Sequence, residues 1–360
     1  MKKMDIMLFI AIILISVFGV LMIYSSSYVW AEYKFNDPFK YVKNQGLFLL
    51  IGIFLMYFIS KIHYKIYYEK CNIILLICTI LLILVLIPFI GTVRNGSRSW
   101  FGIGSFGVQP SEFTKLALII FTAKYLSKNE KNIKSFKKGV FPILLITLII
   151  FGMIMLQPDF GTGVIIVVSI IGMLFIAGAN LSFFLKLGII GAVGVVVLII
   201  IAPYRLDRIM SFVNPWSDPL GTCFQIIQSL YAIGTGGLLG LGFGNSIQKN
   251  FYLPEPQTDF IFSIISEEFG IFGILIVASL FLIIIIRGFN IAKNSNNLFS
   301  KYLVFGIIFQ LAFQSVLNLM VVTGLIPVTG VTLPFLSYGG SSLLITLCSM
   351  GIVLNVSRSN

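Results

Sequence analysis

The sequence predicts an all-α, polytopic membrane protein with about ten transmembrane helices. Hydrophobic residues make up 58% of its 360 residues and charged residues only 11%. A soluble domain is about half apolar and about a quarter charged. The mean hydropathy is +1.02. Apolar runs of roughly 16–28 residues recur along the chain, and each is long enough to cross about 30 Å of hydrocarbon with some tilt.

The first apolar run, 6–23, follows Met1-Lys-Lys. It is longer than the apolar core of a signal peptide and lacks an Ala-x-Ala cleavage site, so we expect an uncleaved span. The segment 25–44 is expected to be a loop whose Trp30, Tyr33 and Tyr41 suit the membrane interface. Further spans are expected at 45–60, 72–90, 110–126, 140–156, 161–179, 187–202, 259–286, 301–322 and 339–356.

The distribution of basic residues predicts the orientation. With the N-terminus inside, 16 of the 25 lysines and arginines fall in inner segments and nine in outer segments or span mouths. The positive-inside rule favours this topology, in which both termini are cytoplasmic. We expect a single transmembrane domain, 1–360. Its outer loops 92–109 and 203–258, the latter large and between spans seven and eight, form the active-site face.

Composition also excludes several classes of function. The net charge of +12 could suggest nucleic-acid binding, but the basic residues lie in short loops between apolar runs, so no nucleic-acid partner is expected. The four cysteines are scattered, without metal-ligand spacing or a disulfide framework. His63 is the one histidine, so the sequence predicts neither a metal site nor a catalytic triad.

The segment 253–270 concentrates acids at the mouth of a span. It carries Glu255, Asp259, Glu267 and Glu268, four of the 13 carboxylates in the chain. Such acids are costly unless they are paired, wetted or used. Thr258 is expected to cap a helix that has Asp259 in its first turn. Ser263 would then share the face of Asp259, Glu267 would lie part-way round, and Glu268 would face away.

A depth count places these acids along the expected helix. Counting about 20 residues back from Arg287, at about 1.5 Å each, puts the outer hydrocarbon boundary near Glu267. Asp259 then lies about 12 Å above this boundary, among the headgroups. A capped helix end with solvated acids is the competing interpretation of this stretch.

Other charged residues are expected at the same outer face. Glu112 and Lys115, spaced i and i+3, can form an ion pair that is either functional or structural. Asp159 lies at an outer turn between two spans, where an ordinary turn role is the alternative. The bases Arg94, Arg98, Lys115, Arg205 and Arg208 complete the set. Bases can hold a leaving diphosphate, and an acid can take a proton from a sugar hydroxyl, so a lipid-linked, diphosphate-activated substrate would suit this face.

Two glycine-rich stretches need separate interpretations. The stretch 234–244 follows no predicted strand, so we expect close packing or a re-entrant turn rather than a nucleotide loop. The stretch 102–107 matches G-x-G-x-x-G literally, but it has no βαβ context and does not predict a dinucleotide site.

Several motifs together resemble one family. They are Asn95-Gly-Ser-Arg-Ser-Trp-Phe, Gln109-Pro-Ser-Glu-Phe-Thr-Lys, Gln157-Pro-Asp-Phe-Gly-Thr-Gly, Asn214-Pro-Trp, Leu253-Pro-Glu-Pro-Gln-Thr-Asp-Phe-Ile-Phe and Pro334-Phe-Leu-Ser-Tyr-Gly-Gly-Ser-Ser. In this order they resemble the SEDS family (shape, elongation, division and sporulation) over nearly the whole chain. The block Gly244-Asn-Ser-Ile-Gln-Lys with Tyr252-Leu-Pro-Glu is more similar to the FtsW/SpoVE branch than to RodA.

The resemblance implies peptidoglycan glycosyltransfer at the outer face of the cytoplasmic membrane, with lipid II polymerised into glycan and undecaprenyl diphosphate released. It assigns catalysis to Asp259, and Glu112, Lys115 and Arg98 to the substrate diphosphate. Arg205 and Arg208 are expected to assist, and Asp159, Glu267 and Ser263 to support the site. Gln257 departs from the family, where many members carry histidine. No metal ligands are assigned, and a divalent cation such as Mg²⁺ stays an open cofactor.

The resemblance also implies partners. They are lipid II and the nascent glycan chain, a class B penicillin-binding protein that supplies the transpeptidase, and other division or sporulation membrane proteins. Two alternatives stay open: a lipid II flippase, for which ten spans would also suit, and a scaffold of the division or sporulation complex. Against the flippase, the acids gather at one face and no polar ladder crosses the predicted midplane.

Overall fold

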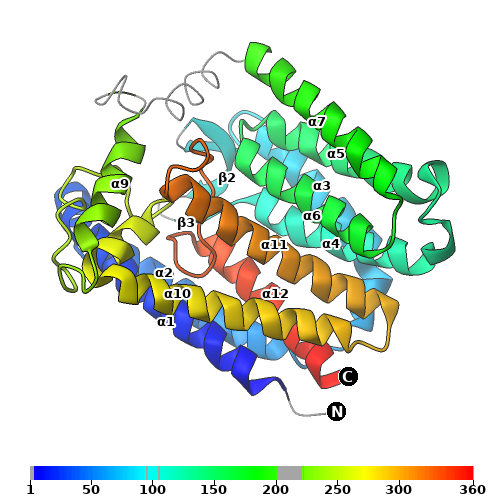
Figure 1. Ribbon diagram of the computed structural model, residues 1–360, viewed down its shortest axis with the longest axis horizontal. Coiled ribbons are helices and arrows are strands. Elements are labelled where there is room, and N and C mark those ends of the chain that lie inside the picture. Colours follow the sequence, from blue (N-terminus) through cyan, green and yellow to red (C-terminus); the bar gives the residue numbers. More distant parts are fainter. Residues whose placement is uncertain (1–3, 95, 104–105, 202–220, 222, 360) are drawn as a thin grey trace.

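The computed structural model describes residues 4–94, 96–103, 106–201, 221 and 223–359. Within them lie eleven α-helices, which confirms the predicted all-α class (Figure 1). They are α1 Ile6–Phe35, α2 Lys40–Ile59, α3 Lys65–Leu86, α4 Pro110–Lys128, α5 Phe141–Met155, α6 Phe160–Ile176, α7 Leu181–Ile201, α9 Phe224–Gly236, α10 Ile261–Lys293, α11 Leu298–Val322 and α12 Gly340–Ser359. A 3₁₀ turn, Glu130–Asn132, and a π turn, Phe136–Val140, connect α4 to α5.

Each of the ten predicted spans overlaps one long helix. Seven helical segments of the described chain are long and apolar enough to cross a membrane by length and composition. The multi-pass architecture is therefore confirmed, while the number of spans stays a prediction.

Both termini lie at one end of the bundle, as Figure 1 shows. The guanidinium of Arg287, near the end of α10, contacts the Asp5 carboxylate at 2.6 Å. The backbone N–H of Asp5 donates to Ser357 Oγ at 3.3 Å, which ties the two termini together. We call the opposite end of the bundle the distal end. The fold agrees with the prediction that both termini share one side, and which side that is stays a prediction.

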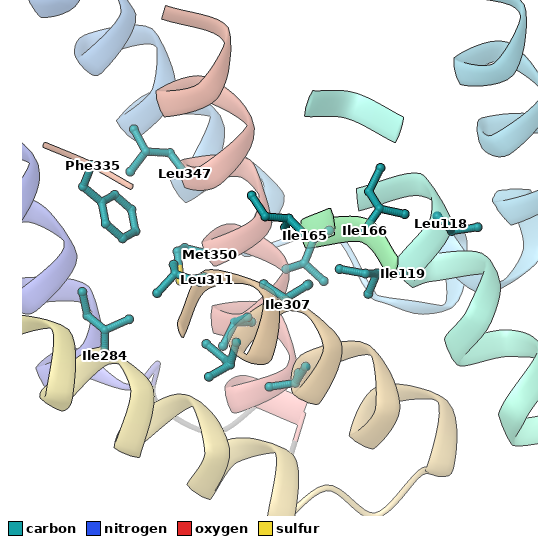
Figure 2. Close-up of a cluster of buried hydrophobic side chains, with 14 of the residues drawn as sticks. Leu118, Ile119, Ile165, Ile166, Ile284, Ile307, Leu311, Phe335, Leu347 and Met350 are labelled. Atoms are coloured by element: carbon teal, nitrogen blue, oxygen red, sulfur yellow. The ribbon is translucent and has the colours of Figure 1, made fainter. Parts of the chain in front are cut away.

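Branched aliphatic side chains fill the centre of the bundle, where α4, α6, α11 and α12 meet (Figure 2). Ile119, Ile165 and Ile307 are each at most 4% exposed. Burying such side chains is the main favourable term in packing a soluble core, but in lipid the gain comes from close van der Waals packing between helices. This core fixes the relative positions of the helices that carry the polar residues described below.

The first helix is longer than predicted. The segment 25–44 was expected to be a loop, but α1 continues to Phe35 and α2 already begins at Lys40. The C-cap of α1 is Asn36, whose backbone is left-handed at φ 53°. No glycine or proline interrupts 20–37, so nothing stops the helix at its serines. At about 1.5 Å per residue its 30 residues span about 45 Å, which exceeds the hydrocarbon thickness of about 30 Å.

A small antiparallel sheet follows α3 at the distal end. It comprises β1 Thr92–Arg94, β2 Ser97–Ile103 and β3 Phe106–Val108 in the order β1-β2-β3. We predicted an outer loop here but no strands. The strands were missed because the segment is short and rich in glycine and serine, which leaves little strand signal. The G-x-G-x-x-G match falls on the β2–β3 hairpin, in keeping with the interpretation that it is not a dinucleotide site.

Helix α10 differs from its prediction at two places. It starts at Ile261, after successive turns through 251–260, so Asp259 lies before the helix and not in its first turn. Thr258 does not cap it: its hydroxyl donates to the Glu255 carbonyl at 2.7 Å. Gly270, at φ 59° and ψ −150°, breaks the helix. The depth count for Asp259 assumed an unbroken helix, and it therefore does not hold.

Candidate active site

Glu112 and Lys115 form the predicted ion pair at the distal end of α4. Pro110 opens the helix at a position where its missing N–H costs nothing. One turn later, Lys115 Nζ lies 2.9 Å from Glu112 Oε1, and the two side chains are 2% and 7% exposed. Lys115 also donates to Gln314 Oε1 on α11 at 3.0 Å. A buried ammonium needs such partners, because desolvating an unpaired charge is expensive.

A small cavity of about 20 Å³ adjoins this pair. Its polar lining comes from Glu112, Gln310, Gln314, Thr346 and Ser349. The space is sufficient for a water molecule and far too small for a sugar. Lys115 is therefore enclosed in this conformation.

Gln314 and Asn318, one turn apart on α11, hold a distal loop by its backbone. Gln314 Nε2 donates to the Thr332 carbonyl at 3.0 Å. Asn318 Nδ2 donates to the Val331 carbonyl at 2.7 Å and to the Asp259 carbonyl at 2.8 Å. The same two side chains thus connect Lys115, the loop 329–332 and Asp259.

The loop 329–332 lies close to Asp259 and to the start of α6, which Asp159 caps. A Cβ added to Gly330 would lie 3.9 Å from Asp259 Oδ2. A Cβ on Gly161 would approach the Thr329 carbonyl to 2.6 Å, so only glycine lets the start of α6 pack this closely. Asp159 caps α6 two residues earlier. The loop 329–332 therefore brings two distant acids to one region.

Asp159 accepts two hydrogen bonds. Its Oδ1 accepts from the Thr162 N–H at 3.2 Å, and its Oδ2 accepts from Gln109 Nε2 at 3.0 Å. Burial raises the pKa of the Asp159 carboxyl, and the charge of Glu112 raises it further, while the Thr162 bonds and Lys115 oppose the rise. The predicted turn residue is thus also electrostatically coupled to the ion pair on α4.

Besides Lys115, one of the predicted diphosphate-binding bases, Arg98, lies within the described residues. Arg98 lies on β2, paired in register with Val93, and its side chain is partly buried. The hydroxyl of neighbouring Ser97 donates to the Gln157 carbonyl, which ties the sheet to the α5–α6 turn. Arg205, Arg208 and the Asn214-Pro-Trp motif lie outside the described residues.

Glu267 and Glu268 hold a different part of the chain. Glu267 accepts from the Ser246 hydroxyl and from the Ile247 N–H, the latter at 3.0 Å. Glu268, which was expected on the side away from Asp259, is 1% exposed and pairs with Lys249 Nζ at 2.8 Å. Ser25 Oγ on α1 donates to the same carboxylate. These acids anchor the loop that leads to Asp259, because Lys249 precedes Asp259 by only ten residues.

Ser263 does not face Asp259 as the helical wheel predicted. Asp259 lies before the helix, so the i, i+4 relationship does not apply. The Ser263 hydroxyl instead pairs with Ser229 Oγ on α9 at 2.7 Å, and Ser229 also donates to the Val322 carbonyl. Ser263 therefore joins α9, α10 and α11.

The glycine-rich stretch 234–244 packs closely, which was one of the two predicted alternatives, and its neighbour is the break in α10. The N–H groups of Leu241 and Gly242 donate to the carbonyls of Glu267 and Glu268, each at 2.9 Å. A helix end needs such partners for its last carbonyls. The location of this turn at membrane depth stays a prediction.

Comparisons with known proteins decide the family. The FtsW/RodA/SpoVE family model, described as "Cell cycle protein", matches residues 5–360. The chain belongs to this family. It is 53% identical over 354 residues to Stage V sporulation protein E of Bacillus subtilis (strain 168), covering 98% of this chain and 97% of that protein. It is 40% identical over 353 residues to "Probable peptidoglycan glycosyltransferase FtsW" of Geobacter sp. (strain M18), covering 98% and 96%.

Solved structures of the same family share the fold. One chain, from "Structural coordination of polymerization and crosslinking by a peptidoglycan synthase complex", has a TM-score of 0.80 and 29% identity, covering 100% of this chain and 99% of that one. The rod shape determining protein RodA of Thermus thermophilus has a TM-score of 0.73 and 28% identity, covering 99% and 97%. The higher identity to the FtsW and SpoVE proteins agrees with the predicted branch.

Within this family member, sequence reasoning missed Gln314, Asn318 and Lys249. A signal for two of them was present: Gln310, Gln314 and Asn318 recur every fourth residue in an otherwise apolar span. Such a polar stripe inside a membrane helix marks a functional or buried face. No comparable pattern pointed to Lys249.

The site also contains Gln257, where the family resemblance leads us to expect histidine. Gln257 is 1% exposed, and its carbonyl accepts from the Tyr338 N–H at 2.8 Å. Among the described residues, its Oε1 has no hydrogen-bond partner. No group of three or more histidine, cysteine, aspartate or glutamate side chains suited to a metal ion occurs in the described part of the chain.

Proposed function

We propose that this chain is a peptidoglycan glycosyltransferase that polymerises lipid II at the outer face of the cytoplasmic membrane. The observation that carries the proposal is the convergence of Asp259, Asp159 and the Lys115 ion pair around the loop 329–332. A carboxylate can take the proton of a sugar hydroxyl, and a nearby lysine ammonium can stabilise the departing diphosphate. The activity named for the FtsW relatives supports the same conclusion.

In the proposed reaction Asp259 acts as general base. It takes the proton from the GlcNAc 4-hydroxyl of the acceptor, whose oxygen attacks the anomeric carbon of the donor with inversion. The bond from that carbon to the diphosphate oxygen breaks, and undecaprenyl diphosphate leaves. Asn318 fixes the backbone of Asp259, which keeps the base in place.

Lys115 and Arg98 would stabilise the departing diphosphate, assisted by Arg205 and Arg208. Glu112 orients Lys115. Because Lys115 is only 3% exposed, we propose that the α4–α11 contact opens when the diphosphate binds. Asp159, with its raised pKa, is placed to tune the charge of this ion pair.

A class B penicillin-binding protein is the proposed partner. It would supply the transpeptidase that crosslinks the glycan. The similarity to a chain of a peptidoglycan synthase complex, described as coordinating polymerization and crosslinking, supports this pairing.

Polymerisation of labelled lipid II by the purified chain with this partner tests the proposal. We expect Asp259→Asn to keep the shape and lower the rate by about 10²–10⁴-fold, the usual contribution of a general base. Asp37→Asn is the matched control, because Asp37 is a distal aspartate that pairs with the exposed Lys43. Undiminished polymerisation by Asp259→Asn would refute the catalytic assignment. Translocation of lipid II in sealed liposomes without any polymer would favour a flippase instead.

A further inference from the structure

A chain of aromatic side chains leads across the distal end toward Asp259. Its members come from the end of α1, the start of α2 and two loops, and we call them the aromatic track. They are Trp30, Tyr33, Phe35, Tyr41, Phe251 and Tyr338. None of these side chains takes part in the proposed reaction.

The outer part of the track is an exposed cluster. The Phe251 ring lies 5.5 Å from the Trp30 ring and 5.4 Å from the Tyr33 ring, both edge to face. Tyr33 is 77% exposed and Phe251 is 51% exposed. Phe251 also has φ 67°, a left-handed backbone that a bulky residue rarely adopts. Strained residues of this kind concentrate at functional sites.

The inner part of the track reaches the loop of the proposed base. The Phe35 and Tyr41 rings lie 5.9 Å apart, and Tyr41 meets Tyr338 edge to face at 4.8 Å. The Tyr338 N–H donates to the carbonyl of Gln257, two residues before Asp259. Gln45 on α2 holds this loop, because it donates to the Ser337 carbonyl and accepts from the Gly339 N–H.

Lysines join the two parts. Lys34 Nζ lies 5.8 Å from the Trp30 ring and 5.7 Å from the Phe35 ring. Lys40 Nζ lies 5.9 Å from the Phe35 ring. The track thus combines apolar ring faces with cationic N–H donors along one continuous path.

We propose that the aromatic track binds the glycan strand beside Asp259. Pyranose rings present C–H faces that stack on aromatic rings, while their hydroxyls need polar groups at the ring edges, which tyrosine and lysine supply. The lysines would also pair with carboxylates of the peptide stems on the strand. This proposal rests on the proposed function, since it names the saccharide that the same site would hold.

An interfacial belt in contact with lipid is the competing interpretation. A belt residue needs only to lie at headgroup depth, and nothing requires it to contact the loop of the proposed base. Here Tyr41 and Tyr338 are only partly exposed and pack between α2 and the loop before α12. The continuous contacts and the hydrogen bond to Gln257 favour a path to the reacting groups.

Binding of a β-1,4-linked N-acetylglucosamine tetramer to the purified full chain in detergent, measured by calorimetry, tests the track directly. We expect Tyr33→Ala and Phe251→Ala each to weaken binding roughly two- to tenfold. Tyr33→Ala lies in a regular helix, so it stays informative if Phe251→Ala fails to fold. Phe54→Ala is the control, because Phe54 on α2 is 68% exposed and lies outside the track.

Polymer length provides the second measurement. With the partner and labelled lipid II, the variants should make shorter glycan strands than the wild type and Phe54→Ala. Unchanged tetramer affinity and strand length in Tyr33→Ala and Phe251→Ala would overturn the proposal. A fall in apparent Tm in liposomes but not in detergent, or loss of partner binding, with unchanged tetramer affinity, would overturn it in favour of a lipid or protein contact. A wild type that binds the tetramer but makes no polymer would refute the proposed function and leave saccharide binding standing.

Discussion

At the scale of single residues, Asn318 makes the hydrogen bonds that hold the backbone of the proposed base. One amide nitrogen satisfies two backbone carbonyls, and one of these belongs to Asp259. Because each N–H of an amide can serve one acceptor, both donors of this side chain are used. An asparagine in a membrane helix thus sets the backbone of the proposed base.

Asn318→Ala should therefore lower polymerisation beyond what the loss of folded protein explains. Leaving the buried Val331 carbonyl without its donor costs about 1–3 kcal/mol, and the part-buried Asp259 carbonyl costs less. Displacement of Asp259 should reduce the rate by about 10²-fold, the scale expected for a misplaced catalytic group. Rates with labelled lipid II and the apparent Tm in detergent measure the two effects. Thr323→Ala, an exposed position at the end of α11, is the control. A rate that falls only in proportion to folded protein would contradict this role.

The ion pair on α4 gives a second test. Lys115→Met leaves Glu112 buried without its partner, which should destabilise the protein by about 3–5 kcal/mol. Adding Glu112→Gln removes the unpaired charge and should restore most of the apparent Tm. Activity should stay low in the double variant if Lys115 serves the diphosphate. A double variant with wild-type activity would assign the pair a purely structural role.

At the scale of elements, the junction between the glycine-rich stretch and α10 determines where the acids lie. The break at Gly270 exposes carbonyls at the end of the first half-helix, and the loop after α9 supplies their donors. Gly240, at φ 77°, lies so close that a Cβ would overlap the Glu268 carbonyl. Such contact between backbones requires glycine.

Gly240→Ala should consequently be poorly tolerated. Its φ is unfavourable for alanine, and the added methyl group would push the loop away from α10. We expect a fall in apparent Tm of several degrees and lower yield of folded protein. Gly234→Ala is the matched control, because that helical position has open space around it. Equal stability of the two variants would show that the close packing is unimportant.

Element positions were largely predictable, whereas contacts between distant segments were not. Apolar runs located every long helix, because lipid-spanning segments have a strong signal of length and composition. The Glu112–Lys115 pair was predictable because i, i+3 spacing on a helix is local. The start of α10 was mispredicted, because turns through Pro254 and Pro256 outweighed the capping signal at Thr258. The Lys249–Glu268 pair depends on the tertiary fold that closes a loop, which sequence spacing does not encode.

At the scale of the whole molecule, the proposed active site lies at one end of the bundle and exposed lysines lie toward the other, so the orientation in the membrane can be tested. The acids, the sheet and the aromatic track gather at the distal end, while the termini and lysines such as Lys131 and Lys134 lie toward the other end. The proposed reaction requires the distal end to face outward, since its glycan product is assembled there. The excess of basic residues in the other segments predicts the same orientation.

Labelling of single introduced cysteines by a membrane-impermeant maleimide should settle the orientation. Asn250→Cys at the distal end should react in intact cells, whereas Lys134→Cys should react only after permeabilisation, and both positions are exposed. The native cysteines should give little background, because Cys71, Cys78, Cys223 and Cys348 are all buried. Labelling of Lys134→Cys in intact cells, with Asn250→Cys protected, would invert the topology. It would also place Asp259 on the side away from the proposed glycan product, and so would refute the proposed function together with the orientation.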